Sequence, residues 1–193
     1  MFKSCRQLVS APQLPATTLA QSCYMGMFTD CIALTSAPQL PATTLAQSCY
    51  YAMFFGCTSL TEAPQLLAET LEVNCYNNML STCPSLNYIK MIATDISANG
   101  CLNSWVSGVA ANGILIKSAN MNDLPNGEDG IPEGWQVYTE EEYELVRRYQ
   151  LNNKENISNK VISLSSSSTD EQYPSAKCVY DLIGNIENLL GEL

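Results

Sequence analysis

The chain has 193 residues with 9 basic and 19 acidic side chains and no histidine, and its formal net charge is −10. The charge is uneven: residues 1–118 carry four basic and five acidic side chains, whereas residues 119–193 carry five and fourteen. Nucleic-acid binders gather Lys and Arg on one face, so this composition excludes nucleic acid as a partner. No run of about 18 apolar residues is present, so we expect no membrane insertion. The first residues lack the apolar core of a secretory signal, so we expect either that the protein is not exported on its own or that this chain is a piece of something longer.

An internal repeat organises the N-terminal part of the chain. The string SAPQLPATTLAQSCY at residues 10–24 recurs unchanged at 36–50, a spacing of 26 residues. The register continues in both directions as one methionine column and two cysteine columns: Met1, Met27, Met53 and Met79; Cys5, Cys31, Cys57 and Cys83; and Cys23, Cys49, Cys75 and Cys101. A repeat of 20 to 50 residues is typical of a solenoid, whose units bury their apolar faces by stacking.

Each repeat predicts one strand and one short helix or helical turn. Proline at 12, 38 and 64 lacks an amide hydrogen and suits the edge of a strand or a bend. Leu45, Cys49 and Met53 follow the i, i+4, i+8 spacing of a helical face. The predicted fold class is therefore an α/β repeat solenoid, leucine-rich-repeat-like with 26-residue units, followed by a C-terminal β cap and a helical tail.

Two further columns are candidate receptor-facing ladders. Thr18, Thr44 and Thr70 form one, which we expect on the surface, and Tyr24, Tyr50 and Tyr76 form the other. Stacked tyrosines on a surface bind carbohydrate or protein, but a tyrosine column also serves as the outer wall of a core. Both interpretations of the tyrosines stay open at this point.

The eight repeat cysteines are predicted to be buried, reduced core residues, because Cys packs as a small hydrophobe. Disulfides or metal ligation are the alternative. The spacing matches no familiar zinc pattern and no histidine is available to complete one, so we expect no metal and no cofactor. Asp123, Glu128 and Asp129 lack the Asp-rich spacing of a calcium loop and are predicted to be solvated turn acids.

The repeat pattern M-F-x-x-C-x-x-L-x-x-A-P-x-L-P-A-T-T-L-x-x-x-C-Y resembles the BspA-like leucine-rich repeats of Bacteroides and related gut bacteria. The resemblance covers residues 1–138 and includes a terminator at Trp105-Val106, at residues 112–117 and up to Trp135-Gln136-Val137. It implies a repeat domain over 1–138 whose cap begins at about residue 105. Within the cap, Ile114–Lys117 and Trp135–Tyr138 are predicted strands, with Trp135 over the last core layer.

The N-terminal end shows no comparable cap. Met1 enters at the methionine column of a repeat. Because open repeat ends expose core, we expect either an upstream part that this chain lacks or a partner over the first repeat.

Residues 139–164 are predicted to form a helix and a connection. Thr139 and Glu142 make a capping box, and the helix is expected to end at about Leu151. Residues 152–159 follow as a polar connection and Val161–Leu164 as a possible strand.

Residues 165–193 are predicted to form a Ser-rich link and an oligomerising helix. Residues 166–181 resemble the S-S-T-D-x-x-Y-P-S-A-K-x-V-Y-D segment of tail-fibre and other fibrous virion proteins of phages that infect Bacteroides-type hosts. The following apolar residues fall on a and d heptad positions: Val179, Leu182, Ile186, Leu189 and Leu193. Phage fibres of this kind are commonly trimers, so the resemblance implies a homotrimer in contact with other virion proteins.

These features predict a non-enzymatic virion fibre or decoration protein of a bacteriophage, assembled in the bacterial host cytoplasm, that binds a host-surface glycan or protein through the repeat face. A bacterial cell-surface leucine-rich-repeat adhesin is the alternative. An enzyme is not expected, because the chain offers no histidine, no G-x-S-x-G motif and no cysteine beside a base.

Overall fold

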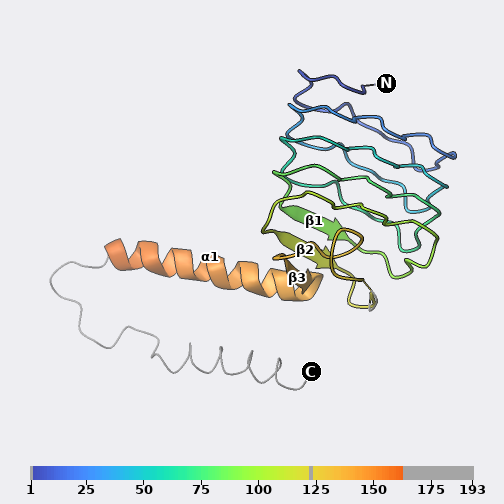
Figure 1. The fold of residues 1–193 in the computed structure, drawn as a ribbon. Helices are drawn as coiled ribbons and strands as arrows, with labels where there is room; N and C mark the ends of the chain where they lie inside the picture. Colours follow the sequence, from blue (N-terminus) through green and yellow to red (C-terminus); the bar gives the residue numbers. More distant parts are fainter. Residues whose placement is uncertain (1, 122–123, 163–193) are drawn as a thin grey trace. The chain divides into compact units, whose positions relative to one another are not determined.

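The computed structural model describes residues 2–121 and 124–162 (Figure 1). Its regular elements are three strands and one helix: β1 (Tyr88–Met91), β2 (Ile114–Lys117), β3 (Gln136–Thr139) and α1 (Glu140–Ile162). The chain divides into two compact units, residues 1–145 and 146–193. The first contains the repeats, the sheet and the start of α1, and the second contains the rest of that helix. In the described ranges no helix is long and apolar enough to cross a membrane.

The predicted fold class is wrong. The three strands form one open sheet of order β1-β2-β3 in which both neighbouring pairs are parallel, and one helix follows it. This is the secondary structure of a small domain, and not of a leucine-rich-repeat-like solenoid with a helical tail. The strand and the short helix expected in every repeat are missing, because residues 2–87 contain only turns, bends and isolated parallel bridges.

The predicted helical segments are replaced by four runs of linked turns, at residues 21–30, 47–56, 73–82 and 99–108, which we call the turn layers. In the first three layers the odd-numbered N–H groups donate three residues back, as from Met25 to Ser22 at 3.2 Å. The even-numbered N–H groups donate to the next layer, as from Tyr24 to Cys49 at 3.0 Å. An α-helix would direct every N–H to the carbonyl four residues back within its own segment. Half of the donors therefore hold successive repeats together.

Every fourth residue of a turn layer has a positive φ. In the first layer these are Ser22, Gly26 and Asp30, with φ of 55°, 59° and 58°. Glycine adopts this conformation freely, and Asn or Asp adopt it more readily than other side chains. The reversal every four residues turns inward pairs such as Met53 and Phe54 to the core, where both are 0 % exposed. This period of four is what made the layers look helical in the sequence.

The core consists of like side chains stacked on one another. The Phe28 ring stacks on Phe2 and on Phe54 with centroid distances of 5.6 Å. The thiols of Cys57 and Cys83 each donate to the carbonyl of a phenylalanine in the preceding layer at 3.1 Å. Equal packing in consecutive layers accounts for the recurrence of the same residue types at these positions.

The last turn layer is closed by the residues between β2 and β3. Trp135 is 7 % exposed and its indole N–H donates to the carbonyl of Ala110 at 2.7 Å. The indole N–H of Trp105 donates to the carbonyl of Gly130 at 3.1 Å. Strand β2 has the predicted bounds, whereas β3 begins one residue later than predicted. Figure 1 shows the three strands at the end of the layered region opposite the N-terminus.

Helix α1 begins at the predicted capping box. The N–H of Thr139 donates to the Glu142 carboxylate at 2.6 Å, and the N–H of Glu142 donates to the Thr139 hydroxyl at 3.3 Å. An ion pair between Lys90 and Glu140 joins its first turn to β1. The helix runs on to Ile162, so the predicted connection at residues 152–159 and a strand starting at Val161 are wrong.

The segment at 166–181 and the heptad positions Val179, Leu182, Ile186, Leu189 and Leu193 lie outside the described residues.

Candidate binding surface

The threonine column lies on the surface of the repeats. Thr18 and Thr44 pair in a parallel bridge, and Thr70 pairs in the same way with Asp95. All three threonines are exposed. None of their hydroxyls has a hydrogen-bond partner within residues 2–121 and 124–162. These hydroxyls are therefore free to bind a ligand.

Local packing explains why the threonines face outward. In the segment Ala42–Leu45, the two ends are buried, with Ala42 2 % and Leu45 7 % exposed. Thr43 and Thr44 between them are exposed. Burying the two apolar ends in the core fixes the backbone, and the hydroxyl pair is left on the outer side.

A shallow open depression of about 590 Å³ lies on this column. Its lining combines polar and apolar side chains from three repeats: Thr43, Thr44, Leu45, Leu67, Glu69, Thr70, Glu72 and Ile92. We call this surface, together with Thr18, the threonine face.

The threonine face is rich in hydrogen-bond acceptors and carries negative charge. Glu69 and Glu72 are exposed, and neither carboxylate forms an ion pair in the part of the chain that the structure describes. Carboxylates repel phosphate and sulfate groups, whereas they accept hydrogen bonds from hydroxyl and ammonium groups. The face therefore suits an uncharged, hydroxyl-rich ligand with an apolar side, or a basic protein surface.

Glu69 and Glu72 were not singled out from the sequence, although the repeat contains a signal for them. Glu69 stands where the two preceding repeats have Thr17 and Thr43, and Glu72 stands where they have Ala20 and Ala46. The third repeat therefore places two acidic side chains where the earlier repeats have neutral ones.

The tyrosine column forms the outer wall of the core and not a surface ladder. Tyr50 and Tyr76 are each 1 % exposed, and Tyr24 is half-buried. Their rings stack, with centroids 5.9 Å apart for Tyr24 and Tyr50 and 6.2 Å apart for Tyr50 and Tyr76. Burial raises the pKa of Tyr50 and Tyr76 above the usual value. Tyr50 and Tyr76 are therefore not receptor-facing residues, because neighbouring layers cover their rings.

The eight repeat cysteines are free thiols, six of them buried. Cys5 is exposed and Cys23 half-buried, because both belong to the first repeat. Burial raises the pKa of Cys49 to about 11 and that of Cys75 to about 12. Thiols that stay protonated are poor nucleophiles and poor metal ligands. Across the described ranges no three His, Cys, Asp or Glu side chains are grouped to hold a metal ion.

Comparison with protein-family models, with curated proteins and with solved structures found no match. Function must therefore be inferred from the chain's own surface chemistry and from the sequence features described above.

Proposed function

We propose that the chain is a non-enzymatic fibre or decoration protein of a bacteriophage particle, which binds a host-surface glycan or protein through the threonine face. The observation that carries the binding role is the row of exposed hydroxyls, unpaired within the described residues, beside an acidic, partly apolar depression. The attachment to a virion rests on the sequence resemblance at residues 166–181 and on the BspA-like repeat pattern.

A neutral glycan is the ligand class that this chemistry favours. Hydroxyl groups of a sugar would donate to Glu69 and Glu72 and exchange hydrogen bonds with Thr44 and Thr70, and the apolar face of a sugar ring would pack on Leu45 or Ile92. Many weak contacts of this kind gain strength when several copies act together, which is what a trimer assembled through the heptad residues of 179–193 would provide.

The test is calorimetric titration of the protein with neutral polysaccharide from the envelope of a Bacteroides-type host. Replacing Glu69 and Glu72 together by Gln and Thr44 by Val should reduce the affinity at least tenfold. Thr58→Val changes an exposed threonine outside the depression and is the matched control. Equal binding by wild-type, variant and control proteins would rule out the threonine face as the site. Light scattering on the wild-type chain should give about three times 21.1 kDa.

A further inference from the structure

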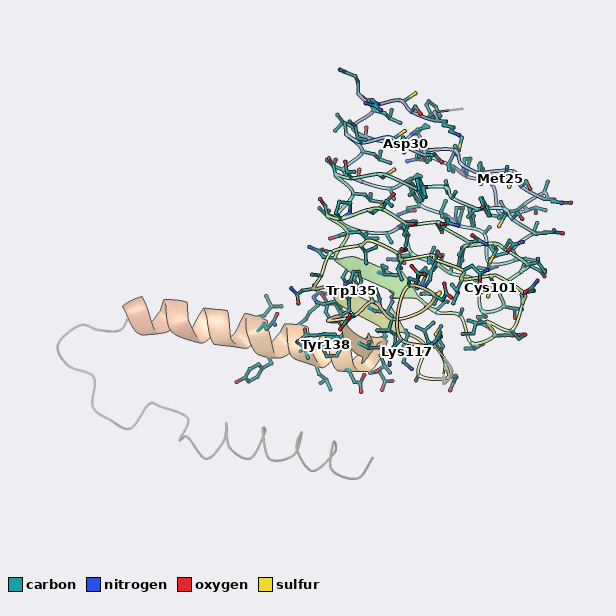
Figure 2. The ribbon with its side chains drawn as sticks, in the orientation of Figure 1. Met25, Asp30, Cys101, Lys117, Trp135 and Tyr138 are labelled. Carbon is teal, nitrogen blue, oxygen red and sulfur yellow. The ribbon has the colours of Figure 1, made fainter. Side chains whose placement is uncertain are left out.

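The first repeat exposes a surface that the second repeat buries, although the two are identical in sequence over residues 10–24 and 36–50. Cys49 and Tyr50 are 0 % and 1 % exposed, whereas their counterparts Cys23 and Tyr24 are only half-buried. Met25, the next residue, is 50 % exposed. The difference comes from the layer before: residues 22–26 cover the second copy, and no described residue covers the first. Figure 2 shows Met25 at the outer margin of the layered region.

The same surface presents a row of free acceptors. The carbonyl oxygens of Gln47, Cys49 and Tyr51 accept hydrogen bonds from the layer before them at 3.0, 3.0 and 2.8 Å. The equivalent carbonyls of the first repeat, at residues 21, 23 and 25, accept none from the described part of the chain. Unpaired backbone groups next to apolar surface are a template for another segment of chain.

The polarity of this row determines what can occupy it. Two copies of the chain that met at their first repeats would bring acceptors against acceptors. The opposite end of the layers does present donors, but the one equivalent to Ala52, Ser104, already donates to the carboxylate of Asp129. Val106 in the same layer donates to the carbonyl of Glu128, so this loop occupies part of the place that a following layer would take. The occupant must instead offer free N–H groups at every second residue of a layer of this kind.

We propose that the exposed face of the first repeat is a docking surface for a polypeptide segment that carries a further copy of the same 26-residue repeat. A copy of residues 27–52 placed one layer before the first would put the N–H groups equivalent to Ser48, Tyr50 and Ala52 opposite the three free carbonyls. Its apolar side chains would cover Cys23 and Tyr24 as the first repeat covers Cys49 and Tyr50. This inference does not depend on the proposed receptor binding.

The test uses the protein with Cys5→Ala and Cys178→Ala, which removes two other thiols that could react. The rate at which the half-buried Cys23 is alkylated is then measured by mass spectrometry. The ligand is a synthetic peptide with the sequence of residues 27–52 and alanine at both cysteines. Its control carries an N-methyl group on the tyrosine equivalent to Tyr50, which removes one donor. We expect saturable binding of the peptide and at least a tenfold slower alkylation of Cys23, with a much weaker effect of the control.

A second variant covers the case in which the free peptide does not adopt the layer. In it, a copy of residues 27–52 is fused directly before Met1 in the same cysteine background. Cys23 should then react as slowly as a buried thiol, and the free energy of unfolding should rise. Alkylation of Cys23 at the wild-type rate in the fused protein would overturn the proposal, whatever the peptide does.

Discussion

The carboxylate of Asp129 accepts a hydrogen bond from the backbone N–H of Ser104, at 2.5 Å. Ser104 is the position at which each earlier layer donates to the layer that follows, so a side-chain carboxylate takes the place of the next repeat. The neighbouring donor of Val106 is satisfied by the carbonyl of Glu128 at 3.2 Å. The acidic loop, predicted to contain solvated turn acids, therefore ends the hydrogen-bond ladder.

Asp129→Ala should lower the free energy of unfolding by about 1–2 kcal/mol, the usual cost of removing a side-chain acceptor that caps backbone donors. Urea denaturation followed by tryptophan fluorescence measures this directly, because Trp105 and Trp135 lie beside the loop. Glu133→Ala changes an exposed acid of the same connection and should alter stability by less than about 0.5 kcal/mol. Equal effects of the two changes would mean that Asp129 does not close the ladder.

Tyr50→Phe should leave the protein as stable as the wild type, or stabilise it by up to about 1 kcal/mol. The Tyr50 hydroxyl is buried and has no hydrogen-bond partner among the residues that the structure describes, which costs free energy relative to the same group in water. Phenylalanine keeps the stacking on Tyr24 and Tyr76. Tyr24→Phe, at the half-buried counterpart, should change little. A loss of more than about 1 kcal/mol for Tyr50→Phe would show that the hydroxyl has a partner in solution.

The free energy of unfolding should fall as the pH rises above 9. Burial raises the pKa of Cys49 from 9.0 to about 11 and the pKa of Cys75 and Cys83 to about 12. Each thiol ionises at a lower pH in the unfolded chain than in the folded one. The buried thiol therefore adds its full contribution to the free energy of unfolding below pH 9, and this contribution is lost as the pH rises from 9 to 11–12. For each thiol that is protonated in the folded chain but ionised in the unfolded one, the free energy of unfolding falls by about 1.4 kcal/mol per pH unit.

Denaturation curves recorded between pH 8 and 10.5 test this dependence. Cys75→Ala should make the fall less steep by about one proton, because the buried thiol at this position is removed. A free energy of unfolding that is constant up to pH 10.5 would contradict the burial of the thiols.

The sequence revealed the 26-residue register, the capping box at Thr139, strand β2 and the buried Trp135, because each depends on local chemistry or on exact repetition. It did not reveal the turn layers. Their inward pairs recur every four residues, which a list of apolar positions cannot separate from a helix of 3.6 residues per turn. Nor did it reveal Glu69 and Glu72, whose meaning comes from neighbours on adjacent repeats. The left-handed positions give the missing signal, since Asn74 and Asn78 stand four residues apart, and Gly100 and Gly26 occupy the same two columns in other layers.

Ala52→Gly distinguishes the turn layers from the helix that the sequence suggested. Ala52 has a φ of 49°, a conformation that costs an alanine about 1 kcal/mol and a glycine almost nothing. In the turn layers this substitution should therefore stabilise the protein by roughly 0.5–1 kcal/mol, after the greater flexibility of glycine in the unfolded chain is allowed for. In a helix interior the same substitution would destabilise by about 1 kcal/mol. Ala46→Gly, in the same repeat at a position without a positive φ, should destabilise in either case. The sign of the change at residue 52, measured by urea denaturation beside that control, decides between the two backbone conformations.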